Sequence, residues 1–364
     1  MINRLLHHLI KHVDSFLMTC LLFTLLIGLF VLYSASGQDI ERVYAQSINI
    51  AVALSCLWMV ANITPYQLER FAPYLYILSV LLLIGVALFG TISHGARRWL
   101  NIGIAQIQPS EIMRIAMPMM LAWYFSKCEG KPKVGHFAFG GLLLAIPVAL
   151  IMKQPDLGTA LLIMASGFYI LFLAGLNWKF LLGGGTLLAA LTPVFWFMLH
   201  DYQRKRIEIL LDPTQDPLGA GYHTIQAIIA IGSGGAAGKG WLNGTQAQLD
   251  FLPERTTDFI FAVFSEEFGF LGNLLLLTFF SLIIMRGLTI ASQAKGTFSR
   301  LLAGSITLTF FTYAFVNMGM VSGILPVVGV PLPLISYGGT SMVTLCLSFG
   351  ILMSIQTHKK LVAT

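Results

Sequence analysis

Charged residues are scarce in this sequence. Of its 364 residues, 10% are Asp, Glu, Lys or Arg, whereas 56% are hydrophobic. An ordinary globular domain has about 25% charged residues, and a soluble chain with so few could not cover its surface with polar groups. The composition therefore excludes a DNA-binding domain, a disordered chain, a coiled coil and a small secreted protein. It indicates an integral membrane protein with several spans.

Cysteine is also rare, with four residues that lie far apart in the chain: Cys20, Cys56, Cys128 and Cys346. They form no CxxC pair and have no histidine at ligand spacing, so the sequence favours neither a metal site nor a disulfide framework. The net charge is +6. In a membrane protein this charge indicates basic loops on the inner face and contact with anionic membrane lipids. Nucleic acid is not an expected partner.

Long apolar runs dominate the chain. A transmembrane helix needs about 20 mostly apolar residues, and the first run is too long for the ~7–15-residue core of a cleaved signal peptide. We therefore predict an all-α, polytopic integral membrane protein with about ten transmembrane helices, which form a single domain over residues 1–364. The predicted spans are 15–34, 44–62, 71–91, 109–126, 137–152, 157–175, 179–199, 262–285, 301–321 and 335–356.

The charged loops predict the orientation. With the N-terminus inside, the inner segments carry more of the basic residues and the outer segments carry most of the acids. This bias follows the positive-inside rule, places both termini in the cytoplasm and makes the outer face the working side. The large outer loop, about 200–257, joins spans seven and eight. Within it, 222–231 predicts a re-entrant or interfacial helix, which is stable only where it is buried or lines a wet cavity.

Asp258 stands on the predicted outer face, where a polar segment meets a long apolar run. A carboxylate held there is able to act as a general base. A simpler interpretation is that Thr257 or Asp258 caps the following helix, because a helix start leaves backbone N–H groups without partners. The residues alone leave both interpretations open.

Two further acids, Glu266 and Glu267, lie inside the same apolar run. Adjacent carboxylates in a membrane helix are costly unless they are paired or hydrated. We expect them either at the boundary between water and lipid or in a buried pair with Arg97, Arg98 or Lys153.

Arg97 and Arg98 lie on the predicted outer face, against the usual preference of basic residues for the inner face. A guanidinium binds phosphate oxygens in pairs, so both are candidate ligands for an anionic substrate. Trp99, which follows them, is also typical of an interfacial anchor. Further on, Pro109 fits the first position of a helix and Glu111 fits its first turn, where a carboxylate complements the helix dipole.

Lys153 precedes another predicted helix start, at Pro155 and Asp156. Its ammonium fits either a phosphate contact or a side chain that extends to the membrane surface. The glycine-rich stretch 232–240 has the wrong spacing for a P-loop. We expect it to be a flexible loop whose backbone amides approach the substrate. The proline- and glycine-rich stretch 326–341 cannot be regular helix throughout, and must line a cavity or pack on protein.

Taken in order, these segments resemble the SEDS family (shape, elongation, division and sporulation proteins) over nearly the whole chain. The short N-terminus and the stretch 334–341 are more similar to the branch that acts in cell elongation than to the division branch. The segments that match are 97–100, 108–111, 154–159, 232–240, 253–261 and 331–341.

The resemblance implies ten helices and a peptidoglycan glycosyltransferase of the cytoplasmic (inner) membrane. Its substrate would be lipid II, an undecaprenyl-diphosphate-linked disaccharide peptide, polymerised on the outer face for elongation and rod shape. Asp258 matches the family's essential acid. It would take the proton from the 4-hydroxyl of the acceptor sugar, whose oxygen displaces the lipid diphosphate with inversion.

The leaving diphosphate needs cations. The candidates are Arg97, Arg98, Lys153, Lys239 and Arg255, and a divalent cation such as Mg²⁺ is able to share the task, although no metal ligand is assigned. Positions that match the family in supporting roles are Trp99, Glu111, Asp156 and Thr159, and Glu266 and Glu267 are further supporting candidates.

The implied partners are a class B penicillin-binding transpeptidase and the elongation proteins MreC, MreD and MreB. The alternatives are a lipid II flippase, the role of the division homologue, and an inactive scaffold. A transporter usually carries ionisable groups near the middle of the membrane. Here Arg114 is the clearest charge within a span, and the other charges concentrate on one face. This pattern favours surface chemistry over transport.

Overall fold

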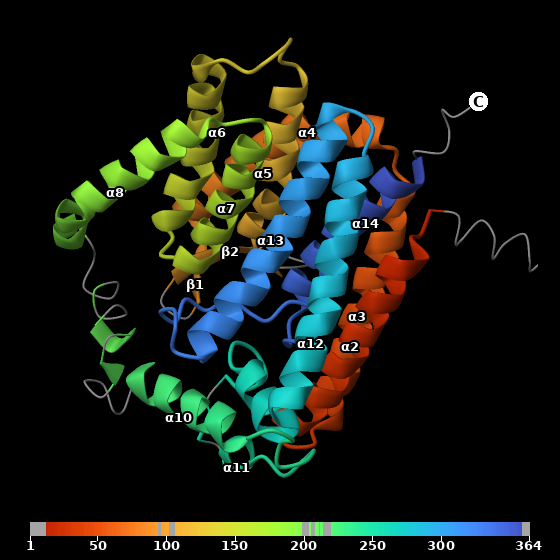
Figure 1. Cartoon of the computed structure of the whole chain (residues 1–364), viewed down its shortest axis with the longest axis vertical. Coiled ribbons are helices and arrows are strands. Elements are labelled where there is room, and N and C mark those ends of the chain that lie inside the picture. Colours follow the sequence, from red (N-terminus) through yellow and green to blue (C-terminus); the bar gives the residue numbers. More distant parts are fainter. Residues whose placement is uncertain are drawn as a thin grey trace, which may run out of the picture.

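A computed structural model describes residues 12–93, 96–101, 106–198, 204, 208–210, 212–213, 220–249, 251–252 and 254–358. These residues form a bundle of helices with a small sheet at one end (Figure 1). The bundle helices are α2 Ser15–Ala35, α3 Ile40–Ala61, α4 Pro65–Phe89, α5 Pro109–Ser126, α6 Val134–Met152, α7 Leu157–Leu173, α8 Trp178–Met198, α12 Ile260–Gln293, α13 Thr297–Val321 and α14 Gly339–Thr357.

A helix covers most of each of the ten predicted apolar runs, although α14 begins at Gly339 instead of residue 335. In the described part of the chain, seven of these helices are long and apolar enough to cross a membrane. The prediction of an all-α, polytopic membrane protein is thus confirmed, with a small sheet of three short strands that was not predicted, whereas the count of ten spans stays a prediction. α10, Ala220–Ser233, contains the predicted interfacial helix, and the short α11 spans Thr245–Gln248.

The helix starts follow from capping residues. The side chain of Asp14 accepts a hydrogen bond from the Leu17 N–H at 2.9 Å and begins α2. Thr64 and Gln67 form a reciprocal capping box at the start of α4. Consecutive helices pack against each other in the pairs α2–α3, α4–α5, α5–α6, α6–α7, α12–α13 and α13–α14.

The two ends of the bundle carry different connecting segments (Figure 1). We call the end that carries strands β1 Thr91–Ser93, β2 Ala96–Asn101 and β3 Gln106–Ile107, together with α10 and α11, the sheet end. The strands pair antiparallel in the order β1-β2-β3. The far end carries the turns α5–α6 and α12–α13 (Figure 1).

α13 runs through the middle of the bundle and packs on α5, α7 and α12 (Figure 1). α3 pairs with α14, and this contact is close because a Cβ added to Gly350 would lie 2.6 Å from the Leu57 carbonyl oxygen. Near the far end, Arg286 of α12 forms a charge-assisted ion pair with Asp14. α8 projects away from the other helices (Figure 1).

Candidate active site

Asp258 lies in a turn directly before α12, at the sheet end. The N-cap residue of α12 is Phe259, and no side chain caps the helix. The interpretation of Thr257 or Asp258 as a helix cap is therefore wrong. Thr257 Oγ1 instead donates a hydrogen bond to Glu254 Oε2 at 2.8 Å, which closes the turn on itself. The Asp258 side chain is half-buried.

A single buried amide joins this turn to the chain before α14. Asn317 of α13 is 0% exposed, and its Nδ2 donates to the main-chain carbonyl of Asp258 at 2.9 Å and to that of Val330 at 2.7 Å. The position of Asp258 is thus set by a side chain from a different helix. Sequence analysis missed Asn317, since one amide within an apolar run has no signature spacing.

Two further bonds hold the same turn against the loop 322–338, which connects α13 to α14. The Tyr337 N–H donates to the Thr256 carbonyl at 2.9 Å, and Ser336 Oγ donates to the Thr257 carbonyl at 2.6 Å. This loop is largely irregular and packs on protein, as predicted from its prolines and glycines.

The middle of loop 322–338 lies between Asp258 and the start of α7. A Cβ added to Gly329 would lie 3.5 Å from Asp258 Oδ2, and one added to Gly158 would lie 2.8 Å from the Val328 carbonyl oxygen. Gly329 has φ +74°, a conformation that favours glycine. The loop therefore joins Asp258 to the helix that begins with the predicted site residue Asp156.

A polar cluster lies at that helix start, between α5 and α7. Arg114 pairs with Glu111 at 2.7 Å and donates to Thr159 Oγ1 at 3.0 Å. Asp156 caps α7 by accepting from the Thr159 N–H at 3.3 Å, which confirms the predicted helix start. Arg98 lies 3.7 Å from Asp156 and donates to the Pro155 carbonyl at 3.0 Å.

Pro109 begins α5 and Glu111 lies in its first turn, as predicted, and the Glu111 carboxylate is also buried and paired. The reason is Arg114, three residues later on the same helix face. The structure thus brings together Arg98, Glu111, Asp156 and Thr159. Trp99 is next to Arg98 in β2, Lys153 is exposed at the end of α6, and Arg255 is half-buried in the Asp258 turn. Arg97 is also in β2, and its side chain is outside the described part of the chain.

Lys239, Glu266 and Glu267 occupy a separate position, at the bend of α12. Lys239 Nζ pairs with Glu266 at 2.7 Å, and Glu266 is 0% exposed. Glu267 is buried and accepts a hydrogen bond from Ser34 of α2. Glu266 is thus in a buried ion pair, as predicted, but the predicted partners Arg97, Arg98 and Lys153 are wrong because the cation is Lys239. The position of the two acids at the membrane boundary stays a prediction.

The glycine-rich stretch 232–240 explains this arrangement. The main-chain N–H groups of Lys239 and Gly240 donate to the carbonyls of Glu266 and Glu267, both at 3.0 Å. A Cβ on Gly238 would lie 2.1 Å from the Glu267 carbonyl oxygen, so only glycine permits the contact. The prediction that these amides approach a substrate is wrong for these two, because they are used to bind α12 where it bends at Gly269.

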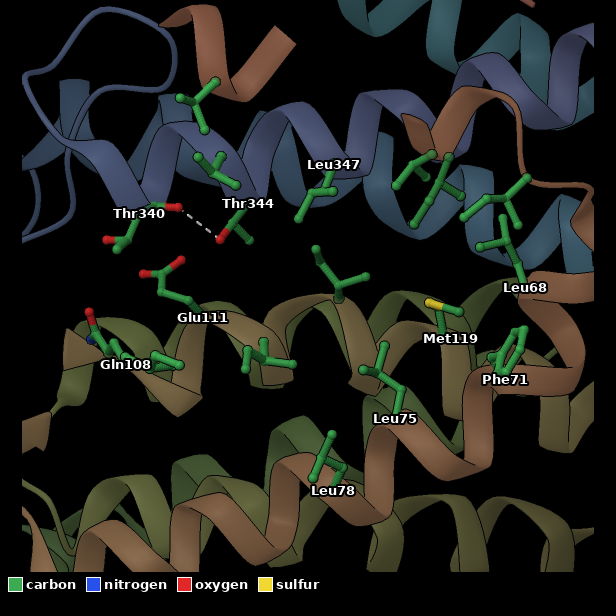
Figure 2. A pocket seen from close by; sticks show the side chains of 18 of the residues that line it. Leu68, Phe71, Leu75, Leu78, Gln108, Glu111, Met119, Thr340, Thr344 and Leu347 are labelled. Carbon is green, nitrogen blue, oxygen red and sulfur yellow. Dashed lines mark hydrogen bonds between the residues drawn. The ribbon is translucent and has the colours of Figure 1, made fainter. Parts of the chain in front are cut away.

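A cavity of about 860 Å³ runs beside the polar cluster, between α3, α4, α5 and α14. Figure 2 shows Gln108, Glu111 and Thr340 near one another at one end and Leu68, Phe71 and Met119 at the other. Apolar side chains line most of its length, and Phe71 is 59% exposed, so the cavity opens to the side of the bundle. It fits an apolar chain whose polar end lies toward Glu111.

The model of the FtsW/RodA/SpoVE family, described as "Cell cycle protein", matches residues 14–361. The chain belongs to this SEDS family. It is 52% identical over 353 residues to "Peptidoglycan glycosyltransferase MrdB" of Escherichia coli (strain K12), covering 97% of this chain and 95% of that protein. It is 31% identical over 425 residues to "Peptidoglycan glycosyltransferase RodA" of Treponema pallidum (strain Nichols), covering 95% and 98%.

Solved structures of SEDS proteins share the fold. A chain from "Structural coordination of polymerization and crosslinking by a peptidoglycan synthase complex" matches with a TM-score of 0.85 at 31% identity, over 96% of this chain and 98% of that one. Rod shape determining protein RodA of Thermus thermophilus matches with a TM-score of 0.72 at 27% identity, over 95% and 97%. The resemblance on which the sequence analysis relied is confirmed.

Replacement of Asn317 by Leu is expected to lower activity roughly 10- to 100-fold, because a small misplacement of a catalytic group has effects of that size. Leucine has the same branched shape and number of side-chain heavy atoms, although its methyl groups are bulkier, and it leaves the Asp258 and Val330 carbonyls without their donor. The measurement is the turnover of the purified enzyme at saturating substrate.

The matched control is Ser305→Ala on the same helix. Ser305 is also buried and donates to a main-chain carbonyl, that of Ser166, but away from Asp258. The expectation is that Ser305→Ala keeps wild-type turnover while Asn317→Leu loses turnover with little change in KM. Equal losses in both variants would show that the effect is general destabilisation.

Proposed function

We propose that this SEDS protein is a peptidoglycan glycosyltransferase that polymerises lipid II, with Asp258 as general base. The observation that carries the proposal is the position of Asp258: a half-buried carboxylate that caps no helix and is fixed through its own main chain by Asn317. The relatives named as peptidoglycan glycosyltransferases support the same activity.

The reaction follows from these positions. Asp258 takes the proton from the acceptor 4-hydroxyl, the oxygen attacks the anomeric carbon of the donor, and the diphosphate leaves with inversion. One displacement needs one base and no covalent intermediate. The negative charge that develops on the diphosphate is stabilised by nearby cations.

We propose Arg98 as the main ligand of the leaving diphosphate. Arg97, Lys153 and Arg255 are proposed as further ligands. Arg98 already lies against the α7 start, which loop 322–338 joins to Asp258. Lys239 contributes indirectly, because its ammonium is paired with Glu266. Among the described residues, no group of three His, Cys, Asp or Glu side chains is placed to hold a metal ion.

The apolar cavity is the proposed path of the polyprenyl chain. Its opening to the side of the bundle admits a lipid from the membrane, and its polar end, at Gln108, Glu111 and Thr340, lies toward the candidate active site. This arrangement suits a substrate with an apolar tail, an anionic link and a sugar.

We further propose that the sheet end faces outward across the inner membrane and that both termini are cytoplasmic. The proposed partner is a class B penicillin-binding transpeptidase, as the complex that couples "polymerization and crosslinking" suggests by analogy. MreC, MreD and MreB are proposed as further partners in elongation.

The test is polymerisation of purified lipid II by the purified protein together with its transpeptidase partner, with glycan chains resolved on a gel. Chains are expected only when the protein is present. A flippase would instead move labelled lipid II across vesicles without making polymer. Transport without polymer, despite proven partner binding, would overturn the proposal.

A further inference from the structure

The far end of the bundle contains a second cavity, of about 320 Å³. It lies between the start of α4, the end of α5 and the turn into α13, at the opposite end of α4 and α5 from the candidate active site. Its lining includes Tyr66, Glu69, Ser126 and the segment 295–299.

The first turn of α13 faces this cavity without a cap. Its N-cap residue is Gly296, which provides no side-chain hydrogen bond, whereas α4 nearby is capped by Thr64. The N–H groups of 297–299 have no partners within the helix. Such a turn attracts an anion through its free N–H groups and the helix dipole.

A second, independent observation comes from the Ser299 side chain. Ser299 lines the cavity and is 7% exposed, yet its hydroxyl makes no hydrogen bond to any residue in the described ranges. Because the Ser299 hydroxyl is still accessible from the cavity, it is placed to bond to a ligand or to water there. Lys295 also lines the cavity, and its ammonium forms no ion pair with the described residues.

The charges around the cavity favour an anion. Among the described residues that line it, Glu69 is the one acid, and it is already paired with Lys127 at 2.9 Å and accepts from Ser126 Oγ at 3.0 Å. The positive charge of Lys295 is therefore not balanced by Glu69. The exposed Arg70 and Arg300 are next in sequence to residues that line the cavity.

We propose that this cavity binds the phosphate group of an anionic membrane lipid. The α13 N–H groups, the Ser299 hydroxyl and the Lys295 ammonium would hold the phosphate oxygens. Tyr66, 75% exposed at the cavity rim, is of the residue type that lies at the membrane surface. Free phosphate offers the same oxygens from a different source, and the experiment separates the two.

The test uses the full chain in detergent. Binding of phosphatidylglycerol and of phosphatidylcholine is compared by native mass spectrometry for the wild type and for Lys295→Gln, Ser299→Ala and the double variant. The wild type is expected to prefer phosphatidylglycerol, and the double variant to lose roughly tenfold in its affinity. Lys131→Gln is the matched control, because Lys131 is an exposed lysine of the α5–α6 turn that does not line the cavity.

Each outcome either supports or overturns the proposed lipid site. Unchanged phosphatidylglycerol affinity in Lys295→Gln and in the double variant, or an equal loss in Lys131→Gln, would overturn the site. Since Lys295 is exposed, its single variant reports on binding even where the double variant fails to fold. Inorganic phosphate is titrated against lipid-free protein and followed by ³¹P NMR. Binding of phosphate as tight as that of the lipid would show a soluble ligand instead.

Discussion

Asp258→Asn is expected to reduce lipid II polymerisation by about 10²–10⁴-fold, because the amide cannot accept the proton of the acceptor hydroxyl. The substitution preserves shape. It also preserves the hydrogen bond from Asn317, because that bond uses the main-chain carbonyl of Asp258 and not its side chain. The fold and the partner contact are therefore expected to persist. The measurement is the amount of glycan polymer formed with the transpeptidase partner present.

The control is Glu41→Gln, which neutralises an exposed acid at the start of α3, also at the sheet end. It is expected to keep full activity. If Asp258→Asn polymerised normally while bound to its partner, the base would have to be sought at Glu111, Asp156 or Glu266. Of these, Glu111 and Glu266 are committed to buried ion pairs.

Arg114→Met is expected to lower the free energy of unfolding by about 3–5 kcal/mol, the usual cost of removing one partner of a buried ion pair. The side chains of Arg114 and Glu111 are 11% and 10% exposed, and water does not easily replace the lost cation. The same substitution leaves Thr159 Oγ1 without its donor. The measurement is the midpoint of unfolding in a denaturing-detergent titration.

The double variant Glu111→Gln with Arg114→Met tests whether the lost stability comes from the unpaired buried carboxylate. Once the carboxylate is neutral, no unpaired charge remains buried, so the double variant is expected to recover part of the lost stability. A double variant as unstable as the sum of both single variants would contradict the ion-pair explanation and point to packing.

The helices were predictable from apolar runs, and their ends less so. α2 was predicted within one residue of its end. α3 begins at Ile40 instead of residue 44, because Asp39 caps it and its first turn is polar. α12 extends to Gln293, past the predicted 285, because Asp14 neutralises Arg286 and allows the helix to continue.

The sequence indicated which residues belong to the candidate site, but not which of their side chains form ion pairs with each other. Motifs along the chain indicated Asp258, Arg98, Glu111 and Asp156 as members. They did not show that Lys239 pairs with Glu266, because that contact depends on how α12 bends. A contact between distant segments is fixed by packing, which one sequence does not display.

The pairing of α3 with α14 has a consequence for biosynthesis. Residues Ala53, Leu57 and Ala61 of α3 are 0% exposed in the finished protein, yet α3 leaves the ribosome long before α14 does. Gln46 of α3 also bonds to Ser336 and Gly338, at 3.4 and 3.3 Å, in the loop that holds the Asp258 turn. The sheet end, which carries the proposed base, therefore assembles only after α14 has been inserted, and a partly translated chain is not expected to start wall synthesis.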